Sequence, residues 1–155
     1  MQILVVGNDE SLLAAIHHAL TQEGYEVVVA HGGREGLRIL RSGSCRLVIS
    51  DWVSPEMDSL ELCREIRNAR FPGYVYIILL TFLDGDNDPL EGLSTGADDF
   101  ITKPFNPAEL IVRVRAAERF LSHDELKHRK AHSEPFTCVD SFDVARLSAW
   151  FGVPG

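Results

Sequence analysis

Short apolar runs alternate along this chain with segments that have the period of an α-helix, and no other feature restricts its fold more. Runs rich in Val, Ile and Leu predict β-strands at residues 3–6, 27–29, 47–49, 75–80 and 100–101. Helix-period segments lie at residues 11–23, 33–41, 59–67, in a shorter stretch after Pro89, and at 110–121. Strands that alternate with helices of this length predict an α/β fold with a parallel sheet covered by helices on both faces.

Two of these helices begin with residues that typically cap a helix N-terminus. Asp58 is followed three residues later by Glu61, which is the spacing of a capping box. Asn106 stands before Pro107 and Glu109, so a cap, a first-turn proline and a reciprocal acid follow in order. The third and fifth helices are therefore predicted to begin directly after Asp58 and Asn106.

Length and composition limit the classes to which this chain can belong. Its 155 residues suit one ordinary domain with a short appendage, and 45% hydrophobic residues suffice for a sizeable core. A formal net charge of -8 argues against direct binding to nucleic acid, whose phosphates need a basic surface. No apolar run approaches the roughly 18 residues of a membrane span, and "MQILVVGNDE" lacks the pattern of a secretory signal. We therefore expect a cytoplasmic protein without a membrane segment.

The cysteines do not indicate a disulfide framework. Cys45, Cys63 and Cys138 are odd in number, widely spaced and never in a CxxC pair. His128 and His132 sit four apart near Cys138, but no second cysteine completes a zinc motif, and a solvated helix face is the preferred interpretation.

The chain changes character after residue 121. Residues 122–155 begin with a polar stretch that carries a small basic cluster, which predicts a helical continuation leading into a linker. Near the C-terminus, aspartates that can cap a helix precede apolar residues and a Gly-Val-Pro-Gly stop. This end predicts one short amphipathic helix, which docks on its own domain, contacts a second copy or begins an output region. The predicted organisation is a domain over residues 1–121 followed by this tail.

Polar residues follow the predicted strands where each strand ends. In a parallel sheet with right-handed crossovers, the carboxyl ends of all strands meet at one edge, where the polar chemistry of such folds collects. This edge is predicted to gather Asn8, Asp9, Asp51, Thr81 and Lys103. The set combines acids, a hydroxyl and one cation.

Four stretches carry a resemblance to a known family: "ILVV" with a polar turn after it, "LVISDWVSPEMDSLELCREIR", "IILLT" and "GLSTGADDFITKPF". From Met1 to about Leu121 the chain resembles the CheY-like receiver domain of bacterial two-component response regulators. The resemblance implies a flavodoxin-like, doubly wound sheet of five parallel strands in the order 2-1-3-4-5, with five helices. The C-terminal helical tail would follow this domain.

The resemblance also implies roles for single residues. Asp51 would be the phospho-acceptor, Thr81 the hydroxyl that follows the phosphoryl group, Lys103 the cation and Phe100 the aromatic switch residue. Lys103 precedes a proline at a bond that is often cis in this family. The chemistry is consistent, because a carboxylate can form an acyl phosphate and phosphoryl transfer needs positioning and neutralised charge. Each residue alone has a structural alternative as a cap, a strand residue or a surface charge; together they favour the functional interpretation.

The metal-binding half of the site departs from the family pattern. Receivers normally carry two adjacent acids after the first strand, where this chain has Gly7 and Asn8. Mg²⁺ prefers carboxylate and other hard oxygen ligands. The candidate ligands are the Asn8 amide oxygen, the Asp51 carboxylate, the Val53 backbone carbonyl and Asp9, which is at least as well suited to cap the first helix. We therefore expect a weak Mg²⁺ site.

Two further departures lie near the predicted acceptor. Phe82 follows Thr81 where a small residue is usual, and its bulk is expected to narrow access to Asp51 and to affect switching. Ser59 stands after "MD" where glycine is common, which is a milder change.

Two functions remain open at this stage. The preferred one is a phospho-accepting receiver, which a histidine kinase or phosphotransfer protein phosphorylates on Asp51. Its output partner, or a second copy of the chain, would bind the face of the fourth helix, fifth strand and fifth helix. The alternative is a pseudo-receiver that binds partners without phosphorylation, which Gly7, Asn8 and Phe82 favour. Neither is an enzyme beyond self-catalysed phosphorylation and dephosphorylation, since a haloacid-type phosphatase expects a second Asp where Val53 stands.

Overall fold

The molecule is described here by a computed structural model, which defines residues 1–51, 57–82 and 93–133. The strands are β1 (Gln2–Val6), β2 (Glu26–Ala30), β3 (Cys45–Asp51), β4 (Tyr76–Phe82) and β5 (Asp99–Lys103). The helices are α1 (Glu10–Gln22), α2 (Gly33–Arg41), α3 (Ser59–Asn68) and α5 (Pro107–Ser133). Residues 93–95 are also helical, where the fourth helix was predicted.

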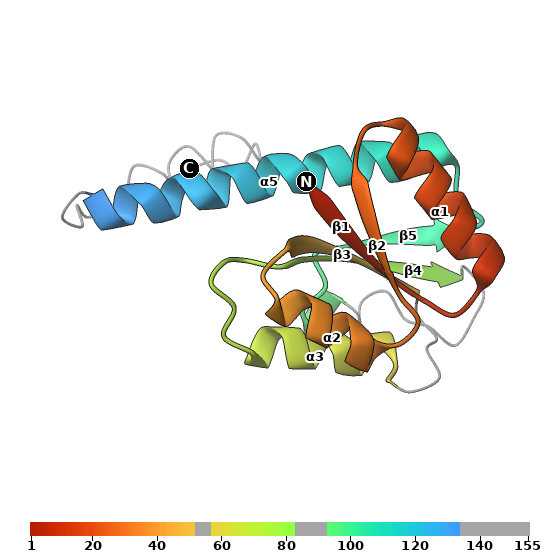
Figure 1. Ribbon diagram of the computed structural model, residues 1–155, viewed down its shortest axis with the longest axis horizontal. Coiled ribbons are helices and arrows are strands. Elements are labelled where there is room, and N and C mark those ends of the chain that lie inside the picture. The colour runs from red at the N-terminus through yellow and green to blue at the C-terminus, as the bar shows by residue number, and fades with distance from the viewer. Residues whose placement is uncertain (52–56, 83–92, 134–155) are drawn as a thin grey trace, which may run out of the picture. The chain divides into compact units, whose positions relative to one another are not determined.

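The five strands form one parallel sheet in the order β2-β1-β3-β4-β5 (Figure 1). Every predicted strand is present, and the doubly wound α/β fold with this strand order is confirmed. At their carboxyl ends, β3, β4 and β5 each continue two residues further than predicted, to Asp51, Phe82 and Lys103, because the sheet ladder continues through these residues. The candidate site residues on these strands are therefore held by sheet pairing rather than by loops.

Helices cover both faces of the sheet. α1 and α5 lie on one face, and α2 and α3 lie on the other (Figure 1). Strand side chains alternate between the two cores, so Ile3 and Val5 face α1 and α5, whereas Leu4 and Val6 face α2 and α3. Because both faces are covered, the central strands are apolar throughout, as the sequence indicated.

The predicted helix caps are present. The Asp58 carboxylate accepts the backbone N–H of Glu61 at 2.8 Å, and the Asn106 side-chain oxygen accepts that of Ala108 at 2.9 Å. These bonds satisfy N–H groups that a helix start would otherwise leave without partners. They fix where α3 leaves the β3 edge and where α5 leaves the β5 edge.

The helical continuation predicted after residue 121 is present. The helix-period pattern reached residue 121, and α5 runs on through the polar stretch to Ser133. No glycine or proline stands between Pro107 and Pro135, and the polar residues after Leu121 include good helix formers, so the backbone has no reason to stop. The chain divides into two compact units, Met1–His123 and Asp124–Gly155. The predicted C-terminal amphipathic helix lies outside the described residues.

In the described part of the chain, no helix combines the length and the apolar character that a membrane span requires.

Candidate functional site

Three neighbouring strands carry polar residues at one edge of the sheet. Asp51 is the last residue of β3, Lys103 the last of β5, and Thr81 the last but one of β4. In the register of the sheet Asp51 pairs with Leu80, and Thr81 pairs with Thr102. The three candidate residues therefore lie on adjacent strands at the same edge.

The Asp51 carboxylate and the Lys103 ammonium form a nearly buried ion pair. Nζ of Lys103 donates to Oδ1 of Asp51 at 2.6 Å, and the two side chains are only 12% and 10% exposed, respectively. Burying either charge alone would be costly, and the partner offsets that cost. A carboxylate beside a fixed cation suits a reaction that brings more negative charge to it, because the cation is already in place. The peptide bond that follows, between Lys103 and Pro104, is cis as expected.

Thr81 is buried directly beside this pair in the sheet. It is 1% exposed and follows Leu80, the register partner of Asp51. Its own partner, Thr102, precedes Lys103 in β5. The strand register thus places the hydroxyl-bearing residue between the strand of the acid and the strand of the cation.

The turn after β1 supplies little charge to the site. The backbone N–H of Gly7 donates to the Ala30 carbonyl at 3.0 Å, which holds this turn against β2. Asn8 is exposed. Asp9 is the N-cap of α1, and its Oδ1 accepts the N–H groups of Ser11 at 3.0 Å and Leu12 at 3.2 Å. The capping role proposed for Asp9 is therefore confirmed, and one of its oxygens is engaged in it.

Comparison with known proteins gives the family. A family model described as response regulator receiver domain matches residues 3–115. The chain belongs to this family.

Individual relatives agree. The chain is 37% identical over 120 residues to PhoP of Bacillus subtilis, an alkaline phosphatase synthesis transcriptional regulatory protein, covering 76% of this chain and 48% of PhoP. Chemotaxis response regulator CheY4 of Vibrio cholerae superposes with a TM-score of 0.68 at 30% identity, over 74% of this chain and 96% of CheY4. A response regulator from Chloroflexus aurantiacus gives a TM-score of 0.70 at 30% identity, over 74% of this chain and 94% of that protein. The chain spans about half the length of the curated relatives it matches first.

Receiver domains typically bind Mg²⁺, and the described residues of this receiver fit that ion poorly. Among them, no group of three or more His, Cys, Asp and Glu side chains is placed to hold a metal. Asp51 is paired with Lys103, Asp9 caps α1 and Asn8 offers only a neutral amide. Mg²⁺ is usually held by one or two carboxylates together with water, so this donor set is thin. The fourth candidate ligand, the Val53 carbonyl, lies outside the described residues.

Of the two predicted switch residues, Phe100 and Phe82, the structure describes the side chain of Phe100 only. Phe100 of β5 is half-buried and packs against the core on the α2 and α3 face. The backbone of Phe82 pairs with Lys103 in the sheet, but its side chain lies outside the described part. Both assignments as switch residues stay predictions.

Two serines next to Asp51 were not recognised as site residues from the sequence. Ser59 was noted only as a mild departure, and Ser50, which directly follows the strand predicted at residues 47–49, was given no role. Both hydroxyls lie beside the backbone carbonyl of Asp51. The available signal was a polar residue directly after the predicted strand "LVI" and directly before Asp51.

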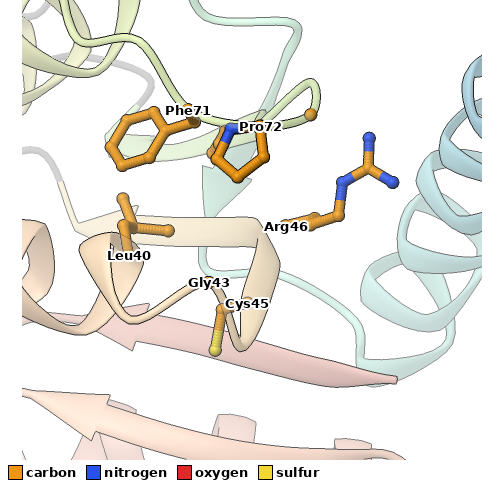
Figure 2. A pocket seen from close by; sticks show the side chains of 8 residues that line it. Leu40, Gly43, Cys45, Arg46, Phe71 and Pro72 are labelled. Carbon is orange, nitrogen blue, oxygen red and sulfur yellow. The ribbon is translucent and has the colours of Figure 1, made fainter. Parts of the chain in front are cut away.

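A cavity of about 200 Å³ lies at the end of β3 that is remote from Asp51 (Figure 2). Its lining includes Cys45, the first residue of β3, together with Leu40 of α2 and the segment around Phe71 and Pro72. Figure 2 shows Phe71 and Pro72 across from Leu40. Because Asp51 ends the same strand, this cavity is separated from Asp51 by the length of β3 and is not part of the candidate site.

The described cysteines do not take part in the site. Cys45 and Cys63 are buried and free, so the expectation of no disulfide holds for them. Burial raises the pKa of the Cys63 thiol to about 11, which keeps it protonated and unreactive at neutral pH.

Proposed function

We propose that this receiver accepts a phosphoryl group on Asp51 from the phosphohistidine of a histidine kinase or phosphotransfer protein. The observation that supports this most is the buried ion pair of Asp51 and Lys103 at 2.6 Å, on strands adjacent to Thr81. A carboxylate paired with a fixed cation at the sheet edge is a ready nucleophile for phosphorus.

In the proposed step an Asp51 carboxylate oxygen attacks phosphorus and a new O–P bond forms. The bond between phosphorus and the imidazole nitrogen of the donor breaks, and the imidazole leaves with the electron pair and takes up a proton. The positive charge of Lys103 neutralises part of the charge that the phosphoryl group brings. Hydrolysis of the acyl phosphate by water restores the carboxylate.

Phosphorylation changes the partner of Lys103. The Asp51 carboxylate becomes an acyl group, so the ammonium transfers its hydrogen bonds to phosphate oxygens, and the Thr81 hydroxyl becomes a donor to the same group. Both residues lie in strands, so the ends of β4 and β5 are expected to shift. This is a population shift driven by local charge, with its consequences on the adjoining face.

The output partner is proposed to contact the face formed by the fourth helix, β5 and α5. On this face, Arg113 of α5 pairs with Asp99 of β5 at 3.1 Å. A second copy of the chain is a candidate for the same face. Light scattering of the protein with and without beryllofluoride tests this candidate, and an unchanged mass would exclude it.

Incubation with acetyl phosphate and Mg²⁺, followed by intact-protein mass spectrometry, tests phosphorylation directly. We expect an adduct of one phosphoryl group that is lost in Asp51→Ala. Asp58→Asn is the matched control, since Asp58 is the exposed N-cap of α3 and asparagine caps equally well. Absence of the adduct from the unmodified chain at every Mg²⁺ concentration would refute the proposal.

The second candidate function is a pseudo-receiver that binds its partner without phosphorylation. The poor donor set after β1 favours it, since the described residues contain no acidic metal cluster. Trp52 adjoins Asp51 in sequence, so its fluorescence during a Mg²⁺ titration separates the two functions. A phospho-accepting site responds to Mg²⁺ or beryllofluoride, whereas a pseudo-receiver gives no response.

A further inference from the structure

Two serines meet behind the acceptor from different elements. Ser50 is the last residue but one of β3, and Ser59 is the first residue of α3. Both are 1% exposed. Their neighbours on this face of the sheet are apolar side chains such as Val48 and Leu62, so two hydroxyls here need a reason.

The two hydroxyls converge on one atom. Ser59 Oγ donates a hydrogen bond to the backbone carbonyl of Asp51, and Ser50 Oγ donates to the same carbonyl at 3.2 Å. The two hydroxyl oxygens lie 3.1 Å apart. The carbonyl of the acceptor residue is therefore held from the strand side and from the helix side at once.

These bonds are not needed to start the helix. Asp58 is the N-cap of α3 and already accepts the N–H of Glu61. Apolar residues at positions 50 and 59 would fill the same space without buried hydroxyls. What the serines add is a link between the end of β3 and the start of α3, on either side of the segment that follows the acceptor.

We propose that Ser50 and Ser59 are positioning residues that hold the Asp51 backbone so that its carboxylate keeps its place beside Lys103. The role in phosphorylation rests on the proposed function. Because either hydroxyl alone still reaches the Asp51 carbonyl, each one can partly hold that carbonyl when the other is removed. Loss of both leaves a buried carbonyl without either donor and releases the backbone of the acceptor.

The test compares Ser50→Ala, Ser59→Ala and the double variant with a matched control pair. Ser42 and Ser44 also have hydroxyls 3.1 Å apart, and Ser42 donates to the Ile39 carbonyl at 2.6 Å. They are exposed and lie before β3, at the end of that strand remote from Asp51. The doubly substituted Ser42→Ala, Ser44→Ala chain therefore loses a similar hydroxyl pair away from the site.

The first readout is the rate of adduct formation at saturating acetyl phosphate. Each single variant is expected to slow it by about 2- to 10-fold, the range of one net hydrogen bond, and the double variant by more than the product of the two. The control pair keeps the unmodified rate. A double variant that folds and reacts within twofold of the unmodified chain would overturn the proposal.

The second readout is the NMR signal of the Lys103 ammonium, which does not depend on phosphorylation. We expect a slowly exchanging signal in the unmodified chain that exchanges faster in the double variant but not in the control pair. If the unmodified chain forms no adduct, the proposed function fails, and this signal alone decides the positioning role. An unchanged signal would reject it.

A third comparison covers the case in which the double variant does not fold. Ser50→Thr and Ser50→Val add nearly the same volume to the strand, but only threonine keeps the hydroxyl. The threonine variant is expected to react faster than the valine variant. Equal rates would contradict a role for the hydroxyl.

Discussion

Gly7 lies against Asp51 at the ends of two neighbouring strands. Val6 pairs with Ser50 in the sheet, so the residues that follow them, Gly7 and Asp51, lie side by side. A Cβ atom at position 7 would lie 3.4 Å from the Asp51 Cβ and 3.4 Å from Leu13 Cδ2, which is ordinary van der Waals contact. The site therefore accepts a Cβ atom where this receiver has none, and an acid at position 7 would branch from a point next to Asp51.

The first prediction follows from this space. Substituting Gly7→Asp together with Asn8→Asp supplies two carboxylates beside Asp51, and Mg²⁺ is expected to bind at least about tenfold more tightly. A Mg²⁺ titration followed by Trp52 fluorescence measures the change. Gly7→Ala adds the Cβ atom at position 7 without a charge and serves as the control. Equal affinity in the control and the acidic variant would show that the missing acids do not limit metal binding.

The second prediction concerns the ion pair itself. Removing one partner leaves a nearly buried charge, so Lys103→Met and Asp51→Asn are each expected to lower the free energy of unfolding by about 3–5 kcal/mol. The double variant removes both charges and should lose less than the sum. Urea denaturation of the four proteins gives the coupling energy. A coupling near zero would indicate that solvent screens the pair despite its low exposure.

The sequence predicted the site because its residues are tied to strand ends. Once the strands are identified, parallel pairing and right-handed crossovers bring Asp51, Thr81 and Lys103 to one edge without any knowledge of side-chain packing. The contact between Ser50 and Ser59 could not be found in this way. It depends on the angle at which α3 returns to the sheet, which no local pattern specifies.

Another contact that the sequence did not reveal holds α3 to the start of β4. The Arg67 guanidinium donates to the Gly96 carbonyl at 2.9 Å, to the Val75 carbonyl at 2.7 Å and to Asp98 Oδ2 at 2.7 Å. Asp98 also accepts the Ile77 N–H at 2.8 Å. One planar side chain thus joins α3 to the start of β4 and to the segment before β5. Nothing in the sequence distinguishes this arginine from an ordinary charged residue on a helix surface.

The third prediction is that Arg67→Lys cannot replace this network. An ammonium on a flexible chain does not reproduce the fork of the guanidinium, so the variant is expected to lose about 2–4 kcal/mol of unfolding free energy. Urea denaturation measures it. Arg64→Lys, on the exposed side of the same helix, should stay within about 0.5 kcal/mol of the unmodified chain. Similar losses in both variants would mean that arginine contributes through helix propensity rather than through these bonds.

The last prediction uses the tyrosine that shares this network. The Tyr74 hydroxyl donates to Asp98 Oδ1. Burial, followed by this hydrogen bond, raises the Tyr74 pKa from 10.0 to about 12. Between these two pH values the folded chain keeps a proton that the unfolded chain has lost. The stabilisation from Tyr74 is therefore complete below pH 10 and is lost as the pH rises towards about 12.

Tyr74→Phe removes both the hydrogen bond and the titration. The variant is expected to be less stable by about 1 kcal/mol at neutral pH, and its stability should fall less steeply than that of the unmodified chain above pH 10. Tyr25 and Tyr76 also have raised pKa values, so a smaller slope remains in the variant. Urea denaturation at a series of pH values from neutral to alkaline follows the difference. Two curves that stay parallel throughout would show that the Tyr74 hydroxyl titrates alike in the folded and unfolded chains.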